Sequence, residues 1–331
     1  MSIEYRTVRS GDMERISALM SRSMPRDVVS ARRLARYTVL EPNFEADALV
    51  IAEHPTDGVI GFAYGTCGVH GIPAMPSNGF LTAACVDPRH RRQGIGTEML
   101  HRVQKNLAQR GATSVTVGGY PQAYFWPGVD AEEYPGAVAF LESHGFTRGG
   151  NAAAMHLDLD AWSISDSVRD LVSTRESEGY TFGPATVEDL PEAVEFAATR
   201  LAPDWGEVMR VAALQDPGAV RRVLLARDPQ GEVVGFATYG AYGDAIERFG
   251  PFGVDETRRG TGLGRILLNL TLRQMRADAA HGAWFLWTGE QTPAGRLYLS
   301  TGFEVSRRFA VMKADLKDTD TATTPMREED R

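Results

Sequence analysis

The feature that most constrains this chain is an internal repeat, because four segments of its first half align in the same order with four segments of its second half. The distance between the aligned partners shrinks along the chain, which places extra residues of the first half in two loops rich in Gly, Pro and aromatic residues, at 66–80 and 118–136. The aligned pairs are 7–19 with 185–196, 48–65 with 222–240, 86–100 with 254–268, and 137–146 with 294–303.

Each half predicts the same series of elements: a short strand, helices, a β-hairpin, a strand, a glycine loop, a helix, a strand, a helix and a closing strand. This alternation predicts an α/β fold with two tandem domains, each a mixed, mostly antiparallel sheet flanked by helices. We expect the domains at 1–160 and 180–314, joined by a helical linker at 161–179. The polar segment 315–331 has few groups to bury and is expected to be a disordered tail.

Composition excludes several classes of protein. The 331 residues carry a net charge of −8, which argues against a nucleic-acid partner. The first residues are charged and no run of eighteen apolar residues occurs, so we expect neither a signal peptide nor a membrane span. Two cysteines, Cys67 and Cys85, cannot form a disulfide framework, so we expect a cytoplasmic protein. The seven histidines show no metal-ligand spacing, and we expect no metal site. Monomer and homodimer remain alternatives.

Two glycine loops carry the first functional signal. The sequences VDPRHRRQGIG (86–96) and VDETRRGTGLG (254–264) each follow an apolar strand and precede an amphipathic helix. A helix N-terminus preceded by glycines offers unpaired backbone N–H groups and the positive end of the helix dipole, which suit a pyrophosphate. The loops lack both the Lys-Ser/Thr of a P-loop and the third glycine of a dinucleotide fingerprint.

The loops match R-x-x-G-x-G, and both copies close on a helix that ends in Gly-Phe. With these motifs the chain resembles the GNAT superfamily of acyl-CoA-dependent N-acyltransferases, over about 5–160 and 178–314. Two such patterns in one chain are similar to the tandem architecture of the mycothiol synthase family.

The resemblance implies that acetyl-CoA places its pyrophosphate on the amides of 93–97 and 260–265. Its pantetheine arm would follow the strands ending at Val86 and Val254, each of which diverges from the next strand in this superfamily. Glycines and a proline inside the second of these strands independently favour either a β-bulge or a broken ladder there. The cofactor-binding candidates are Val86, Arg91, Arg92, Gln93, Gly94, Ile95, Gly96 and Thr97 in the first copy, and Val254, Arg259, Gly260, Thr261, Gly262, Leu263, Gly264 and Arg265 in the second.

Acyl transfer to an amine needs a base for the amine and a proton for the leaving thiolate. The resemblance puts the acid, a tyrosine, five residues before the closing Phe, which is Tyr298 in the second copy and Leu141 in the first. We therefore expect catalysis in the second copy. Glu247 is the candidate base, with Glu290 as the alternative, because the equivalent strand of the first copy has no carboxylate.

The resulting hypothesis is an acetyl-CoA-dependent N-acetyltransferase that transfers an acetyl group to a primary amine of a small molecule by direct attack. The alternative is a non-catalytic acyl-CoA-binding or regulatory protein, and an aminoacyl-tRNA-using transferase is disfavoured by the negative charge. The first copy could bind acetyl-CoA without turnover. The acceptor stays open between an aminoglycoside, a polyamine, an amino acid and a peptide terminus.

Overall fold

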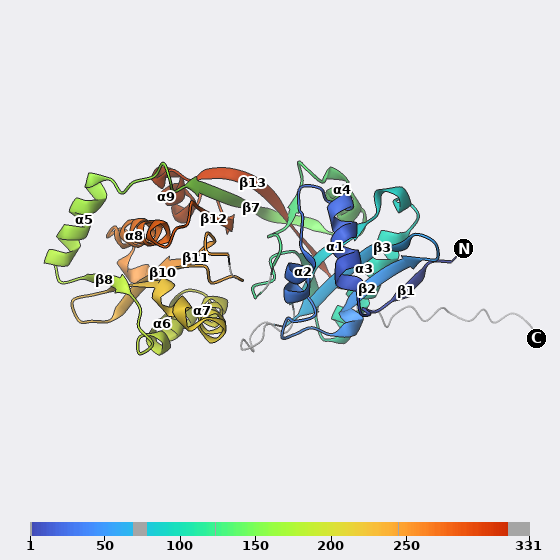
Figure 1. The fold of residues 1–331 in the computed structure, drawn as a ribbon, viewed down its shortest axis with the longest axis horizontal. Coiled ribbons are helices and arrows are strands. Elements are labelled where there is room, and N and C mark those ends of the chain that lie inside the picture. Colours follow the sequence, from blue (N-terminus) through green and yellow to red (C-terminus); the bar gives the residue numbers. More distant parts are fainter. Residues whose placement is uncertain (1, 69–77, 123, 244, 317–331) are drawn as a thin grey trace, which may run out of the picture. The chain divides into compact units, whose positions relative to one another are not determined.

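The computed structural model describes residues 2–68, 78–122, 124–243 and 245–316. Contacts between residues divide the chain into two compact units, Met1–Gly150 with Ala310–Arg331, and Asn151–Phe309 (Figure 1). Most of the predicted loop at 66–80 and most of the predicted tail at 315–331 lie outside the described residues.

The first unit is a mixed sheet with helices on both faces. Its strand order is β1-β2-β3-β4-β5-β13, in which β4 and β5 are parallel and the other pairs that are resolved are antiparallel. The elements are β1 (Glu4–Arg6), α1 (Asp12–Ser23), α2 (Ala31–Tyr37), β2 (Leu49–His54), β3 (Gly58–Cys67), β4 (Asn78–Val86), α3 (Ile95–Gln109), β5 (Ser114–Val117), β6 (Val129–Asp130) and α4 (Pro135–Ser143).

Two apolar clusters hold the helices of the first unit to opposite faces of its sheet. Alternating side chains of β2 and β3 point to the two faces, so that Ile51 and Phe62 pack with α1 and α2 while Ala52 and Ala63 pack with α3 and α4. The apolar residues of α3 recur at helical spacing and are fully buried, as at Met99, which explains why this segment forms an amphipathic helix.

The second unit repeats this arrangement. The strands β8, β9, β10 and β11 form an antiparallel sheet in that order, with α8 on one face and α6 and α7 packed against the other. Its elements are α5 (Asp166–Ser177), β8 (Thr181–Pro184), α6 (Leu190–Phe196), α7 (Pro203–Gln215), β9 (Val223–Arg227), β10 (Val233–Tyr239), β11 (Phe249–Val254), α8 (Leu263–Ala277), β12 (Gly282–Thr288) and α9 (Pro293–Thr301).

The closing strands are exchanged between the two copies. The strand β7 (Thr147–Asp158) starts in the first unit and pairs with β12 of the second, whereas β13 (Glu304–Asp315) starts in the second unit and pairs with β5 of the first. The chain thus passes from one unit to the other inside β7 and returns inside β13 (Figure 1).

The α/β fold class with mostly antiparallel sheets is confirmed. The contact units differ from the predicted segments 1–160 and 180–314 because residues 151–160 lie in the second unit and residues 310–314 in the first. The helix α5 lies within the segment 161–179, where a helical linker is predicted. None of the helices in the described part of the chain is both long enough and apolar enough to span a membrane.

Candidate active site

In both copies the strand before the glycine loop separates from its neighbour. In the first copy, β4 pairs with β5 only from Asn78 to Leu81, and residues 82–86 continue without β5 partners among the described residues. In the second copy, β11 is an edge strand, and a single parallel bridge between Arg248 and Trp284 connects the start of β11 with β12. Each divergence leaves strand N–H and C=O groups available to an extended amide such as pantetheine.

The two glycine loops have the same backbone conformation. Positive φ angles occur at Arg92 and Gly94 in the first loop, and at the aligned Gly260 and Gly262 in the second. Gly94 and Gly262 are the N-caps of α3 and α8. The first bonds inside the helices are donated by the amides of Glu98 and Ile266, so the three preceding amides of each helix have no partner within it. These are amides that the sequence predicts for the pyrophosphate, and their arrangement fits an anion.

An aspartate and an arginine hold each loop at its start. The carboxylates of Asp87 and Asp255 accept hydrogen bonds from the backbone two residues later, and each forms an ion pair with an arginine from the helical region before β2 or β9. The Nε atom of Arg22 lies 2.8 Å from Asp87, and that of Arg200 lies 2.9 Å from Asp255. Sequence reasoning missed both arginines, although they occupy nearly aligned positions of the repeat.

These contacts lower the pKa of both carboxyl groups. The pKa of Asp87 is held below its usual range first by the hydrogen bond from the Arg89 side chain and then by Arg22. The pKa of Asp255 is lowered first by the hydroxyl and amide of Thr257 and then by Arg200. Both loops are therefore held by ionised aspartates at neutral pH.

The side chains predicted to bind the cofactor make different contacts in the two loops. Arg91 turns back toward the strand, where its Nε donates to the carbonyl of Val86 at 3.1 Å. Arg259 pairs with Glu256 at 2.7 Å on the exposed surface, and Thr97 lies 3.1 Å from the Nε2 of His144. The backbone of the loops rather than these side chains therefore offers the groups that an anion would contact.

Helix α5 covers one side of the second loop. The Nε of Arg175 donates to the carbonyl of Thr261 at 2.9 Å, and Arg265 reaches the hydroxyl of Ser167 at 3.0 Å. A Cβ placed on Gly262 would lie 2.8 Å from the Cδ2 of Leu171, whereas a Cβ on Gly94 would meet nothing within 4 Å. The second loop is thus braced by a helix that the first loop lacks in the described part of the chain.

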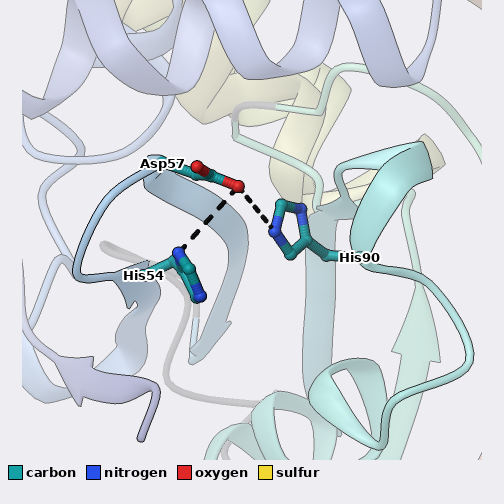
Figure 2. Close-up of side chains that lie close together, drawn as sticks. All are labelled: His54, Asp57 and His90. Atoms are coloured by element: carbon teal, nitrogen blue, oxygen red, sulfur yellow. Dashed lines mark ion pairs between the residues drawn. The ribbon is translucent and has the colours of Figure 1, made fainter. Parts of the chain in front are cut away.

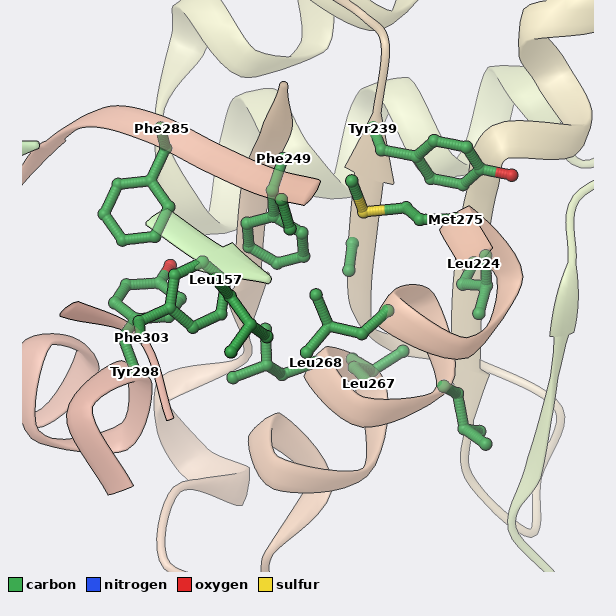
Figure 3. Close-up of a cluster of buried hydrophobic side chains, with 14 of the residues drawn as sticks. Leu157, Leu224, Tyr239, Phe249, Leu267, Leu268, Met275, Phe285, Tyr298 and Phe303 are labelled. Atoms are coloured by element: carbon green, nitrogen blue, oxygen red, sulfur yellow. The ribbon is translucent and has the colours of Figure 1, made fainter. Parts of the chain in front are cut away.

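Tyr298 lies where β11 and β12 diverge. It extends from α9 into an aromatic cluster that includes Phe285 of β12 and Phe249 of β11 (Figure 3). Its ring centroid lies 4.4 Å from that of Phe285 and about 6 Å from those of Phe249 and Phe252. Only 8 % of the residue is exposed, and this burial raises the pKa of Tyr298 well above its usual value. The hydroxyl therefore stays protonated at neutral pH.

The aligned position of the first copy holds an apolar side chain. Leu141 is 4 % exposed and belongs to the core between α4 and the sheet. In the loop at 118–136 of the first copy, Tyr120 is fully buried and donates to the Glu41 carboxylate at 2.5 Å, beside Tyr64. This tyrosine serves a buried hydrogen-bond network.

The two candidate bases are both engaged. The Oε1 of Glu247 accepts the backbone amides of His281 and Gly282, each at 3.1 Å, which ties the start of β11 to the start of β12. Both bonds end on Oε1, so a role as a base would use Oε2. The other candidate, Glu290, pairs with Arg308 at 2.7 Å, and this guanidinium lowers the pKa of Glu290. A carboxylate of lowered pKa is a weaker base, which counts against Glu290.

A match to a protein-family model shows the family of this chain. The acetyltransferase (GNAT) domain model matches residues 45–148 and 219–305, which together exceed half of the chain and fall one in each copy. The chain belongs to the GNAT family and is an N-acetyltransferase of tandem architecture. Members of this family use acetyl-CoA as the acyl donor.

Curated relatives share one name. The chain is 29 % identical to a mycothiol acetyltransferase of Clavibacter sepedonicus over 77 % of both chains. It is 26 % identical to a mycothiol acetyltransferase of Corynebacterium glutamicum (strain R), over 70 % of this chain and 74 % of the relative.

Solved structures of other proteins share the fold of this chain. A GCN5-related N-acetyltransferase from Sphaerobacter thermophilus superposes with a TM-score of 0.72 at 18 % identity, covering 96 % of both chains. A tandem GNAT protein from the clavulanic acid biosynthesis pathway superposes with a TM-score of 0.62 at 17 % identity, over 96 % of this chain and all of the other. At these identities the likeness concerns the fold alone.

Proposed function

We propose that this chain transfers the acetyl group of acetyl-CoA to a primary amine of a small molecule, and that the second copy performs the reaction. The observation that carries the assignment to the second copy is the position of Tyr298, whose ring contacts both strands where β11 and β12 diverge. The first copy has Leu141 in its place. The candidate bases Glu247 and Glu290, just before β11 and just after β12, support the same assignment.

In the proposed reaction the amine nitrogen attacks the thioester carbonyl, so that a C–N bond forms and the C–S bond breaks. The amides at the start of α8, Leu263, Gly264 and Arg265, would bind the pyrophosphate, with Val254 and the edge of β11 along the pantetheine. The Tyr298 hydroxyl, which its raised pKa keeps protonated at neutral pH, would give its proton to the leaving sulfur. Glu247 would accept the proton of the amine through its Oε2, directly or through water.

The first copy would bind acetyl-CoA without turnover. Its loop at 91–97 has the same backbone conformation as the loop at 259–265, and its strands β4 and β5 also diverge. It has the binding groups but no tyrosine at Leu141.

The names of the relatives suggest the acceptor. Because the curated relatives are named mycothiol acetyltransferases, we propose the desacetyl form of mycothiol as the first acceptor to test. Their identity to this chain lies below 30 %, so the assay should also contain glucosamine, a polyamine and an amino acid.

Release of free CoA thiol from acetyl-CoA tests the proposal. We expect release with at least one amine, with formation of the N-acetyl product in equal amount. A protein that binds acetyl-CoA in calorimetry but releases no thiol with any amine would instead be the non-catalytic acyl-CoA-binding protein. That result would contradict the proposal.

A further inference from the structure

Three potential metal ligands meet in the first copy. His54 ends β2, Asp57 lies in the turn before β3, and His90 ends the short helix that follows Asp87 (Figure 2). The Nε2 of His90 lies 2.9 Å from Asp57 Oδ2, and the Nδ1 of His54 lies 3.9 Å from the same oxygen. The three ligand atoms lie within 4.8 Å of one another.

The second copy uses an ion pair at the same two positions. Asp228 aligns with His54 and Arg258 with His90, and the two side chains meet at 2.9 Å. In both copies this contact ties the turn between two strands to the glycine loop. The first copy replaces the aspartate and the arginine with two imidazoles and adds Asp57 where the second copy has Gly231.

Two imidazoles and a carboxylate suit a divalent transition metal. Neutral imidazole nitrogen and carboxylate oxygen are ligands of zinc, which accepts three protein ligands and a water molecule. Two tetrahedral ligands of one zinc ion lie about 3.4 Å apart. The 2.9 Å distance between His90 Nε2 and Asp57 Oδ2 would therefore have to open by about 0.5 Å when the ion binds. A shift of His54 Nδ1 from its 3.1 Å contact with Thr56 would complete the set.

The surroundings of His90 favour its Nε2 atom as the metal ligand. Its side chain is 11 % exposed, and its Nδ1 is buried with no hydrogen-bond partner among the described residues. This Nδ1 faces Asp87 Oδ1 at 3.9 Å. Metal binding at Nε2 would place the ring proton of His90 on Nδ1. A carboxylate that faces this second nitrogen orients the ring of a metal-binding histidine. The nearby Arg89 is paired with Asp87 at 3.0 Å, which reduces its repulsion of a cation.

We propose that His54, Asp57 and His90 bind a divalent transition metal such as zinc, which fastens the β2–β3 turn to the glycine loop of the first copy. The metal takes the place of the ion pair between Asp228 and Arg258 in the second copy. The site differs from the expectation of no metal because its ligands come from two segments that are distant in sequence. It does not depend on the proposed acyl transfer.

The test uses the full chain after treatment with a chelator and dialysis. We expect one equivalent of zinc to bind, several degrees of increase in melting temperature on adding zinc, and an absorption band when cobalt(II) is added instead. The variant His54→Asp with His90→Arg rebuilds the ion pair of the second copy. It should keep the metal-free melting temperature and lose the response to zinc.

Two further variants keep the result decisive. Asp57→Asn changes an exposed side chain and should weaken zinc binding at least about tenfold without unfolding the protein. The matched control His281→Ala removes a surface histidine of the second unit and should bind zinc as the unsubstituted protein does. No zinc binding by the unsubstituted protein, or binding that the rebuilt ion pair leaves unchanged, would overturn the proposal.

Discussion

The ring of Tyr298 lies 4.4 Å from the ring of Phe285, centroid to centroid, at the point where β12 separates from β11. This contact fixes the side chain of the proposed acid against one strand of the gap, while Phe252 contacts it from the other. Because the surroundings are aromatic and buried, the pKa of Tyr298 is raised. The proposed proton donor is thus itself a member of the aromatic cluster.

Replacing Tyr298 with phenylalanine removes the hydroxyl and keeps the aromatic packing. We predict that Tyr298→Phe lowers kcat about 100-fold, with the KM for acetyl-CoA changed less than about twofold, since general acid catalysis contributes on this order. The raised pKa also predicts that turnover of the unsubstituted protein shows no decline from loss of this proton between pH 7 and 9. An unchanged kcat in the variant at both pH values would show that the acid is another group.

The brace between α5 and the second loop predicts an effect on acetyl-CoA binding. Arg175→Ala removes the guanidinium that holds the Thr261 carbonyl, so we expect a several-fold increase in the KM for acetyl-CoA with little change in kcat. Arg169→Ala on the same helix is the control, because Arg169 pairs only with the exposed Asp166 among the contacts described. Equal KM values for the two variants would mean that the brace does not support the loop.

The two N-cap glycines predict different losses of stability. Alanine at Gly94 or Gly262 would have to adopt a positive φ, which costs about 1–2 kcal/mol. Gly262→Ala also collides with Leu171, and we expect about 1–3 kcal/mol of further loss from overpacking. Calorimetric unfolding of both variants measures the difference. A Gly94→Ala variant as unstable as Gly262→Ala would contradict the tighter packing of the second loop.

Asp255 predicts a dependence of stability on pH. Its folded pKa is lowered, so its contribution is complete well above the ordinary value of 3.8 and is lost as the pH falls below that value. Asp255→Asn should therefore lower stability by about 1 kcal/mol at pH 7 and by less at pH 3. Melting curves from pH 3 to 7 measure this, with Glu256→Gln on the exposed surface as control. If the difference in stability between Asp255→Asn and the unsubstituted protein stayed constant across this range, the loss would come from altered packing and not from the charge of Asp255.

Much of the site could be predicted from sequence because the constraints are local. The glycines at 94 and 262 stand where the backbone needs positive φ, and the apolar spacing of 97–110 indicates the helix that α3 forms at Ile95–Gln109. The glycines and the proline inside β11 indicate a bulge or a broken ladder, and this strand has a register shift toward β10 and a single bridge to β12. These features depend on residues within one segment.

The strand exchange could not be predicted, because the two closing strands are interchangeable by sequence. The segments AAMHLD (153–158) and AVMKAD (310–315) have the same apolar pattern. Asp158 pairs opposite Gly282, and Asp315 opposite Ser114, which are aligned positions of the repeat. The two strands therefore share an apolar pattern and a register, and neither segment contains a local signal that names its partner strand.

The histidine cluster and the arginines that hold the glycine loops also depend on residues that are distant in sequence. Arg22 and Arg200 contact aspartates more than fifty residues away, and no local pattern marks them. Comparing the copies position by position would have shown that His54 and His90 replace Asp228 and Arg258. A repeat thus contains information on contacts that a single copy lacks.

Acetyl transfer after blocking each loop in turn tests the central claim most directly. Gly96 and Gly264 are aligned, lie in the first turn of α3 and α8, and would each place a Cβ about 3.5 Å from an aromatic carbon. An aspartate at either position is compatible with the helix and repels a pyrophosphate. We predict that Gly264→Asp abolishes turnover while Gly96→Asp leaves kcat unchanged. Loss of turnover in Gly96→Asp, with activity retained in Gly264→Asp, would contradict catalysis by the second copy.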